Sequence, residues 1–175
     1  NHDILGTLFT RQLTEAEMNK FILEKEGIYQ QLCLQTDMKL APGAVAFLQF
    51  LNMNRIPCTI ATASGPENVD FYFKHFGLNS FFDPSRVILN DGSIRSKPHP
   101  QIFRKAIGVL GIMANETLVF EDSYTGIIAA EKAGVGKIII VDSGHRDYKR
   151  WNFQKIRSFD EVDRKLFLPC LLYTS

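Results

Sequence analysis

Short apolar runs rich in β-branched residues alternate with amphipathic segments from Ala41 onwards, and no other feature limits the possible folds as strongly. The runs occupy residues 58–62, 86–89, 117–120 and 137–141, and helices are predicted over 44–54, 66–76, 100–110 and 124–133. Strands that are apolar on both faces and separated by helices belong in a parallel sheet that is covered on both sides. The sequence therefore predicts an α/β fold, a doubly wound domain with a Rossmann-like parallel sheet.

The first 36 residues have a different pattern, which is helical throughout. Thr14 and Glu17 have the spacing of a capping box, in which each side chain bonds a free backbone N–H. The turn residues Ala41-Pro42-Gly43 then mark the change of pattern. We therefore predict a helical unit over 1–36 and an α/β core over 37–169.

Composition excludes several classes of protein. The chain has 45% hydrophobic and 22% charged residues, which is typical of a soluble globular domain. Its formal net charge of +1 argues against binding to nucleic acid through bulk electrostatics. Its three cysteines are too few and too scattered for a disulfide framework, and no apolar run is long enough to span a membrane. We expect a cytoplasmic monomer with neither a nucleic-acid nor a membrane partner.

Polar residues follow two of the predicted strands, at the sheet edge where such folds bind ligands. Thr62 ends one strand and Ala63 follows it, Glu121 and Asp122 follow another strand, and Lys97 precedes the helix over 100–110. A hydroxyl with free N–H groups binds phosphoryl oxygens, a lysine offsets their charge, and carboxylates hold Mg²⁺. The sequence therefore predicts a phosphoryl-transfer site.

The order ATAS, SKPHPQIF and VFEDSYTGIIAAEKAG closely resembles motifs two to four of the haloacid dehalogenase superfamily, in the subgroup of β-phosphoglucomutase and phosphoglycolate phosphatase. The resemblance implies that residues 1–36 are the remnant of an α-helical cap. It implies that Thr62 and the Ala63 N–H bind the transferring phosphoryl group and that Lys97 bridges this group to the nucleophile. It also implies that Asp122 with Glu121 holds Mg²⁺.

The first motif of that family, DxDGT on the central strand, is absent. Asp3 begins a partial match, but Leu5 stands where the second carboxylate belongs and no β-branched run precedes it. We therefore expect the nucleophilic aspartate to lie upstream and the sheet to lack its first central strand. Residues 170–175 resemble a translated sequencing adapter, and we expect them to be a non-native tail.

The resemblance implies an enzyme, a Mg²⁺-dependent phosphatase or phosphomutase that acts on a small phosphorylated metabolite such as a sugar phosphate. The missing aspartate would attack phosphorus and form an aspartyl-phosphate, while Lys97 and Mg²⁺ offset the charge of the phosphoryl oxygens. The two strands that flank the missing one must either leave a slot or pair directly. An open slot exposes unpaired backbone groups, so we expect this chain alone to be inactive and poorly stable.

Three other classes of protein compete with this interpretation. A receiver domain also gathers carboxylates, a hydroxyl and a lysine around Mg²⁺, but it carries its carboxylate pair near the start of the chain. A noncatalytic binding protein on the same scaffold would lack the first aspartate of DxDGT. A nicotinamide-dependent oxidoreductase needs a glycine-rich turn after its first strand, and no GxGxxG occurs here.

Each candidate residue, taken alone, also has an ordinary structural interpretation. Thr62 is typical of a strand-end turn, and Lys97 is typical of a solvated loop. Glu121 and Asp122 also suit the first turn of a helix, where carboxylates complement the helix dipole. Only their joint order at strand ends favours a functional site.

Two aromatic segments and the histidines are assigned structural roles. The segment 71–82 is rich in Phe and is predicted to pack in the core. The run 145–151 mixes basic with aromatic residues, and we interpret it as a solvated loop rather than as a nucleic-acid patch. His99 and the other histidines show no ligand spacing, so we expect no metal there.

Overall fold

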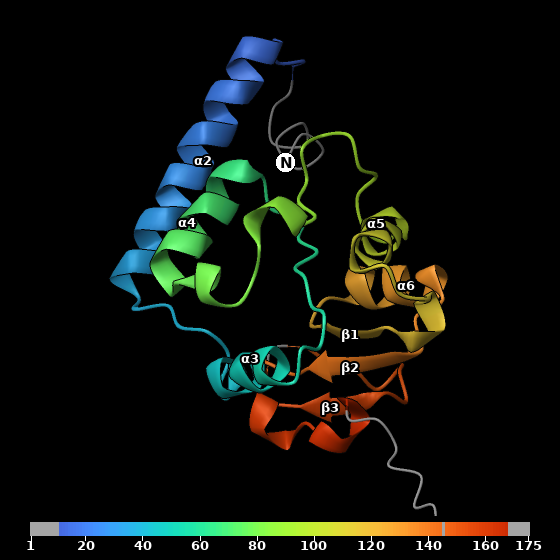
Figure 1. The fold of residues 1–175 in the computed structure, drawn as a ribbon. Coiled ribbons are helices and arrows are strands. Elements are labelled where there is room, and N and C mark those ends of the chain that lie inside the picture. The colour runs from blue at the N-terminus through green and yellow to red at the C-terminus, as the bar shows by residue number, and fades with distance from the viewer. Residues whose placement is uncertain (1–10, 145, 168–175) are drawn as a thin grey trace, which may run out of the picture.

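The protein is described by a computed structural model that covers residues 11–144 and 146–167, so the predictions for 1–10 and 170–175 lie outside it. The α-helices are α2 (Glu15–Gln35), α3 (Ala44–Met53), α4 (Pro66–Phe76), α5 (Gln101–Leu110) and α6 (Tyr124–Ala133). The strands are β1 (Leu118–Glu121), β2 (Lys137–Val141) and β3 (Gln154–Ile156). Short 3₁₀ helices such as Pro84–Arg86 and Phe159–Glu161 complete the fold (Figure 1).

The three strands form one parallel sheet in the order β1-β2-β3, which Figure 1 shows as a stack. Val119 of β1 lies opposite Ile138 of β2, and Ile140 of β2 lies opposite Lys155 of β3. The predicted α/β class with a parallel sheet is therefore confirmed. Strand β3 was not predicted, because it is only three residues long and begins with the exposed polar pair Gln154 and Lys155.

The predictions of strands over 58–62 and 86–89 are wrong, because only an isolated parallel bridge joins Ala61 to Ile88. The Thr62 N–H donates to the Ile88 carbonyl at 2.8 Å, and the Ile88 N–H donates to the Ile60 carbonyl at 2.9 Å. Arg86 belongs to the preceding 3₁₀ helix. A strand requires several consecutive residue pairs with a neighbouring strand. Among the described residues, these two segments share only the one bridge, and neither belongs to the sheet of β1, β2 and β3.

Helices cover both faces of the sheet, as predicted. Successive residues of a strand point to opposite faces, and two clusters of apolar side chains follow this alternation. The cluster against α5 and α6 contains Ile102, Phe103, Val119, Ala129, Ala130 and Ile138. The cluster against α3 contains Phe47, Leu51, Ile139, Ile156 and Val162.

Helix α2 begins as the sequence predicts, at a capping box. The Glu17 N–H donates to Thr14 Oγ1 at 3.3 Å, and the Thr14 N–H donates to Glu17 Oε2 at 2.9 Å. Residues 11–14 precede the helix, so the prediction of helix throughout 1–36 is wrong there. The capping box defines the N-terminus of α2, because its side chains accept hydrogen bonds from backbone N–H groups that have no partner within the helix.

Helix α2 lies beside α4, apart from the sheet (Figure 1). Gln30 Nε2 donates to Asn68 Oδ1 at 3.0 Å, and the Tyr72 hydroxyl donates to the Tyr29 hydroxyl at 3.1 Å. The rings of Tyr29 and Tyr72 meet edge to face with centroids 6.5 Å apart. Polar side chains and aromatic edges, rather than a wide apolar seam, therefore hold α2 against α4.

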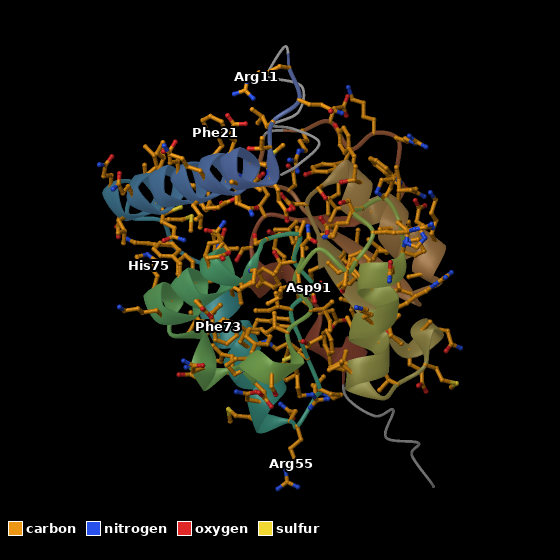
Figure 2. The ribbon with its side chains drawn as sticks, turned by 90° about the horizontal axis from the view of Figure 1, so that it is seen from above. Arg11, Phe21, Arg55, Phe73, His75 and Asp91 are labelled. Carbon is orange, nitrogen blue, oxygen red and sulfur yellow. The ribbon has the colours of Figure 1, made fainter. Side chains whose placement is uncertain are left out.

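The Phe-rich segment packs as predicted, whereas the run 145–151 does not. Phe73, labelled on α4 in Figure 2, is buried with Val69, Leu78 and Val87. Tyr148 and Trp151 are only 3% and 7% exposed, so the interpretation of this run as a solvated loop is wrong. Their rings pack with Ile127 and Ile140 and cover the end of β2 and α6.

No helix in the part of the chain that the structure describes combines the length and the apolar character needed to cross a membrane.

Candidate functional site

The turn between β1 and α6 holds the Glu121 carboxylate at the N-terminus of α6. Ser123 caps this helix, because its Oγ accepts from the Gly126 N–H at 3.0 Å. Both the N–H and the hydroxyl of Ser123 donate to Glu121 Oε1, at 3.1 and 2.6 Å. A helix N-terminus favours negative charge, so the end of β1 is a stable place for a buried carboxylate.

Lys97 reaches the same carboxylate from the loop before α5. Its Nζ lies 2.7 Å from Glu121 Oε2, and the two side chains are only 13% and 8% exposed. The ammonium also lies 5.0 Å from the centroid of the Phe103 ring. The two oxygens of Glu121 are thus divided, one bound by Ser123 and the other by Lys97.

Gly126 leaves the space that the Glu121 carboxylate occupies. A Cβ built on this glycine would lie much closer than van der Waals contact to all three carboxyl atoms of Glu121. The first turn of α6 therefore needs glycine here for a steric reason. In the sequence, Gly126 follows the Glu121-Asp122 pair at a short distance. That spacing alone does not show that the Glu121 side chain occupies the space beside this glycine.

Asp122, the neighbouring carboxylate, faces solvent. Its side chain is 57% exposed, and Oδ2 lies 3.2 Å from Nη1 of Arg146. Nη1 of Arg146 and the Tyr148 hydroxyl both donate to the Asp122 carbonyl oxygen at 2.6 Å. Burial raises the pKa of the Tyr148 hydroxyl above its ordinary value.

Arg146 and Tyr148 contact a candidate site residue, Asp122, and the sequence did not reveal these contacts. Both lie in the run that was interpreted as a solvated loop, more than twenty residues after Asp122 in the chain. The available signal was the apolar ring pair Tyr148 and Trp151, three residues apart, which indicates a packed segment.

Thr62 and Ala63 are placed separately from these charged groups. Thr62 Oγ1 accepts from the Ser64 N–H at 3.1 Å, which is the ordinary turn role, and Ala63 is exposed. Within residues 11–144 and 146–167, no hydrogen bond or ion pair joins either residue to Lys97 or to the carboxylates. The convergence of all predicted residues on one cleft stays a prediction.

Both Asp122 and Glu121 are carboxylates, which is the donor type that Mg²⁺ prefers, but the two differ in accessibility. Mg²⁺ in phosphoryl-transfer sites binds one or two carboxylates and completes its octahedron with waters and phosphate oxygens. Asp122 offers an accessible carboxylate, whereas both oxygens of Glu121 already accept hydrogen bonds. No group of three or more His, Cys, Asp or Glu that could hold a metal occurs in the described part of the chain.

A large apolar cavity of about 630 Å³ borders the site. Residues 57–61 line one side of it, and β1 lines another. Of the predicted site residues it touches only Glu121. The cavity is therefore a feature beside the charged site rather than the place where a charged phosphoryl group would lie.

Comparison with known proteins places these features in a family. The family model described as a haloacid dehalogenase-like hydrolase matches residues 4–134, which is more than half of the chain. The probable pseudouridine-5′-phosphatase of Drosophila melanogaster is 34% identical over 113 residues, which is 62% of this chain and 49% of that protein. The phosphorylated carbohydrates phosphatase of Thermotoga maritima is 28% identical, over 66% of this chain and 50% of that protein.

The solved structures agree with these relatives. The crystal structure of a haloacid dehalogenase hydrolase of family IA, variant 3, from Entamoeba histolytica superposes with a TM-score of 0.83 at 29% identity. It covers 94% of this chain, and this chain covers 75% of it. The chain spans about half the length of the two relatives named above. The family that the motifs resemble is thus confirmed, and the chain belongs to the haloacid dehalogenase-like hydrolases.

Proposed function

We propose that the protein is a Mg²⁺-dependent phosphatase or phosphomutase that acts on a small phosphorylated metabolite such as a sugar phosphate. The relatives named above are phosphatases of phosphorylated carbohydrates and of a nucleoside phosphate by their names. The nucleophilic aspartate, which would carry the phosphoryl group as an aspartyl-phosphate, lies outside these 175 residues in this proposal. The proposed substrate, and the binding partner of the protein, is thus a small phosphate ester.

The observation that carries the proposal is the ion pair of Lys97 and Glu121 at the carboxyl end of β1. A lysine ammonium with little exposure is held 2.7 Å from a carboxylate at the sheet edge where α/β folds bind ligands. Lys97 offsets charge on the phosphoryl oxygens and on the nucleophile. Glu121 keeps the ammonium in place, because Ser123 and the end of α6 fix the carboxylate.

Asp122 and Glu121 would hold Mg²⁺, which supplies positive charge to the phosphoryl oxygens and orients them when bound. Asp122 presents its carboxylate to solvent, where an incoming phosphate can share the same ion. Arg146 and Tyr148 orient Asp122, since both donate to its backbone carbonyl oxygen. These hydrogen bonds to the carbonyl oxygen hold the Asp122 backbone even when the Arg146 guanidinium no longer contacts the Asp122 carboxylate.

Thr62 and Ala63 complete the site as phosphate-binding residues. Ala63 is exposed and lies just before α4, whose first helical residue is Pro66. A hydroxyl and backbone N–H groups in that position bind anionic oxygens without adding a charge. In this proposal these residues hold the transferring phosphoryl group opposite the carboxylates.

Residues 1–36 form the proposed remnant of a cap, and residues 37–169 form the core. Helix α2 contacts the core through α4, by the Gln30–Asn68 and Tyr29–Tyr72 hydrogen bonds. A helical unit held mainly by polar contacts can move against its neighbour, as lids that exclude water from active sites do. The cap would select the substrate.

The proposal is tested in a protein that includes the DxDGT motif. Asp122→Asn should lower kcat and raise the Mg²⁺ concentration needed for half-maximal turnover, because it removes one ligand charge. His99→Ala is the control, because in the described residues the hydrogen bonds of His99 go to Arg95, Ser96 and Gln101 rather than to a proposed site residue, and the variant should change neither value. Release of inorganic phosphate from a panel of sugar phosphates, glycerol phosphate and nucleoside monophosphates measures both effects.

Equal losses in the two variants would contradict the assignment of Asp122. Formation of an isomeric phosphate ester instead of inorganic phosphate would identify a mutase. The 175-residue chain alone should show no Mg²⁺-dependent turnover, and turnover would show that the nucleophile lies within it.

A further inference from the structure

Hydrogen bonds in both directions tie the turn after β1 to the loop that follows β2. The Tyr124 hydroxyl donates to the Asp147 carbonyl at 2.9 Å and accepts from the Asp147 N–H at 3.1 Å. From the loop, the Tyr148 hydroxyl and Nη1 of Arg146 both donate to the Asp122 carbonyl at 2.6 Å. The rings of Tyr124 and Tyr148 also meet edge to face, with centroids 5.8 Å apart. The position of Arg146 is therefore fixed by several contacts around it rather than by one surface ion pair.

This arrangement brings the Arg146 guanidinium to the Asp122 carboxylate. Nη1 lies 3.2 Å from Oδ2, while the same nitrogen bonds the carbonyl oxygen of Asp122. In the part of the chain that the structure describes, Asp122 makes no other ion pair, and Lys97 pairs with Glu121 instead. The more accessible of the two candidate metal ligands is therefore already paired with a cation.

The two contacts of Arg146 with Asp122 differ in strength. The bond to the carbonyl oxygen is 2.6 Å long, whereas the contact with the carboxylate is 3.2 Å long and joins side chains that are 42% and 57% exposed. Exposed ion pairs contribute little to stability, because water screens the two charges. The guanidinium can therefore leave the carboxylate easily, while its bond to the carbonyl oxygen keeps it nearby.

A divalent cation and a guanidinium compete for the same carboxylate. Arginine keeps its proton in proteins, so Arg146 cannot lose its charge when a metal arrives. Two positive groups at one carboxylate repel each other, and this repulsion falls only with the inverse of their distance. Glu121 offers no alternative, since both of its oxygens already accept hydrogen bonds. A metal that binds Asp122 therefore binds against the charge of Arg146.

We propose that Arg146 is a positioning residue that sets the Mg²⁺ affinity of the site, because its guanidinium holds the Asp122 carboxylate without metal and releases it when metal binds. This inference rests on the proposed function, in which Asp122 is a metal ligand. The bonds of Arg146 and Tyr148 to the carbonyl oxygen keep the Asp122 backbone in place in both states. The site thus keeps its geometry without the metal, and its affinity for the metal is lower as a result.

A titration with Mg²⁺ tests the inference in the 175-residue chain, which contains Asp122, Arg146 and Tyr148. NMR shifts of the Asp122 and Ser123 backbone amides give the Kd at constant ionic strength. Arg146→Gln removes the charge but keeps an amide that can bond the carbonyl oxygen, and the Kd should fall about threefold to tenfold. Arg146→Lys keeps the charge and should bring the Kd back toward the value of the unmodified chain.

The guanidinium itself reports its release from the carboxylate. In the unmodified chain the Arg146 Nε–H resonance should move in step with saturation of the backbone amides, because the group leaves Asp122 as Mg²⁺ binds. The Arg55 Nε–H resonance should stay unchanged, since Arg55 is exposed and projects into solvent beyond the end of α3 (Figure 2). An Arg146 resonance that does not respond to Mg²⁺ would overturn the inference, because a purely structural role predicts that result.

Two further variants separate the local charge from other effects. Arg55→Gln changes the net charge by the same amount as Arg146→Gln and should leave the Kd unchanged. Tyr148→Phe removes the other donor to the Asp122 carbonyl oxygen without removing a charge, so it should not lower the Kd. A fall of the Kd in Arg55→Gln equal to that in Arg146→Gln would assign the effect to net charge. An equal fall in Tyr148→Phe would assign it to a looser turn, and either result would overturn the inference.

Failure of the inference and failure of the proposed function give different results. Mg²⁺ binding that is unchanged or weaker in Arg146→Gln would overturn the inference and leave the metal site at Asp122 in place. Absence of Mg²⁺ binding in the unmodified chain and in every variant would overturn the metal site itself, and the inference with it.

Discussion

The two flanks of the apolar cavity look alike in sequence but differ in structure. Residues 58–62 and 117–120 are both short apolar runs followed by polar residues. The second run becomes β1, with four register pairs to β2, whereas the first makes only one bridge. The comparison teaches that an apolar run becomes a strand only where another strand pairs with it.

The flanks also differ in how tightly they are packed. Val119 and Glu121 of β1 are buried, with 8% and 9% of their surface exposed. Residues 58–61, Ile60 among them, are all half-buried. From this difference in burial and strand pairing, we expect the β1 flank to be the rigid half and the 58–61 flank to be the loosely held half.

Breaking the ion pair at the end of β1 should have the largest effect on stability. Lys97→Met leaves the buried Glu121 carboxylate without its ammonium, which should cost about 3–5 kcal/mol of unfolding free energy. Lys149→Met is the control, since Lys149 pairs with Asp147 on the exposed surface and should cost less than about 1 kcal/mol. Urea denaturation of each variant measures the difference. Equal losses would show that the β1 corner is not the rigid half.

Truncation of two isoleucines compares β2, which pairs with β1, with the 58–61 flank. Ile140→Ala should cost about 2–5 kcal/mol, because it opens a cavity in a fully buried position. Ile60→Ala, on the loose flank, should cost about 1 kcal/mol, near the centre of the range for ordinary substitutions. Thermal or urea unfolding gives both values. A larger loss for Ile60→Ala would reverse the comparison.

A methyl group at Gly126 should disturb the rigid corner moderately. Gly126→Ala places Cβ against the Glu121 carboxylate and should cost about 1–3 kcal/mol. Gly108→Ala in α5 is the control, because nothing lies within 4 Å of its Cβ, and it should stabilise the protein by about 0.5–1 kcal/mol. If both substitutions stabilise the protein, Gly126 has no steric role in placing Glu121.

The smallest effect concerns α2, far from both flanks. The Arg11 guanidinium, with help from the Thr14 N–H, lowers the pKa of Glu17 from 4.5 to about 2. A lowered folded-state pKa means that the stabilisation is complete above the unfolded value and is lost as pH falls through about 4.5 to 2. NMR titration of the Glu17 side chain and the Thr14 amide should show a midpoint near pH 2. A midpoint near 4.5 would contradict the capping geometry; in Glu17→Gln the response should vanish.

Sequence reasoning predicted the local parts of this fold well. The capping box at Thr14 and the helices over 44–54, 66–76, 100–110 and 124–133 all occur where the sequence predicts them, to within one residue. These features depend on hydrogen bonds within a few residues of the chain, so the nearby sequence is sufficient to define them. The motifs also placed Lys97 and Glu121 together, as the ion pair shows.

The tertiary structure decided which runs pair and which side chains meet. Nothing in residues 58–62 alone distinguishes them from β1, because a strand needs a partner that comes from elsewhere in the chain. Arg146 and Tyr148 reach Asp122 only because the fold returns the chain to the end of β1. By itself the sequence determined the helices, their ends and the family motifs, since these depend on neighbouring residues. Strand pairing, the cavity and the surroundings of each carboxylate depend on contacts between distant segments, which only the folded chain brings together.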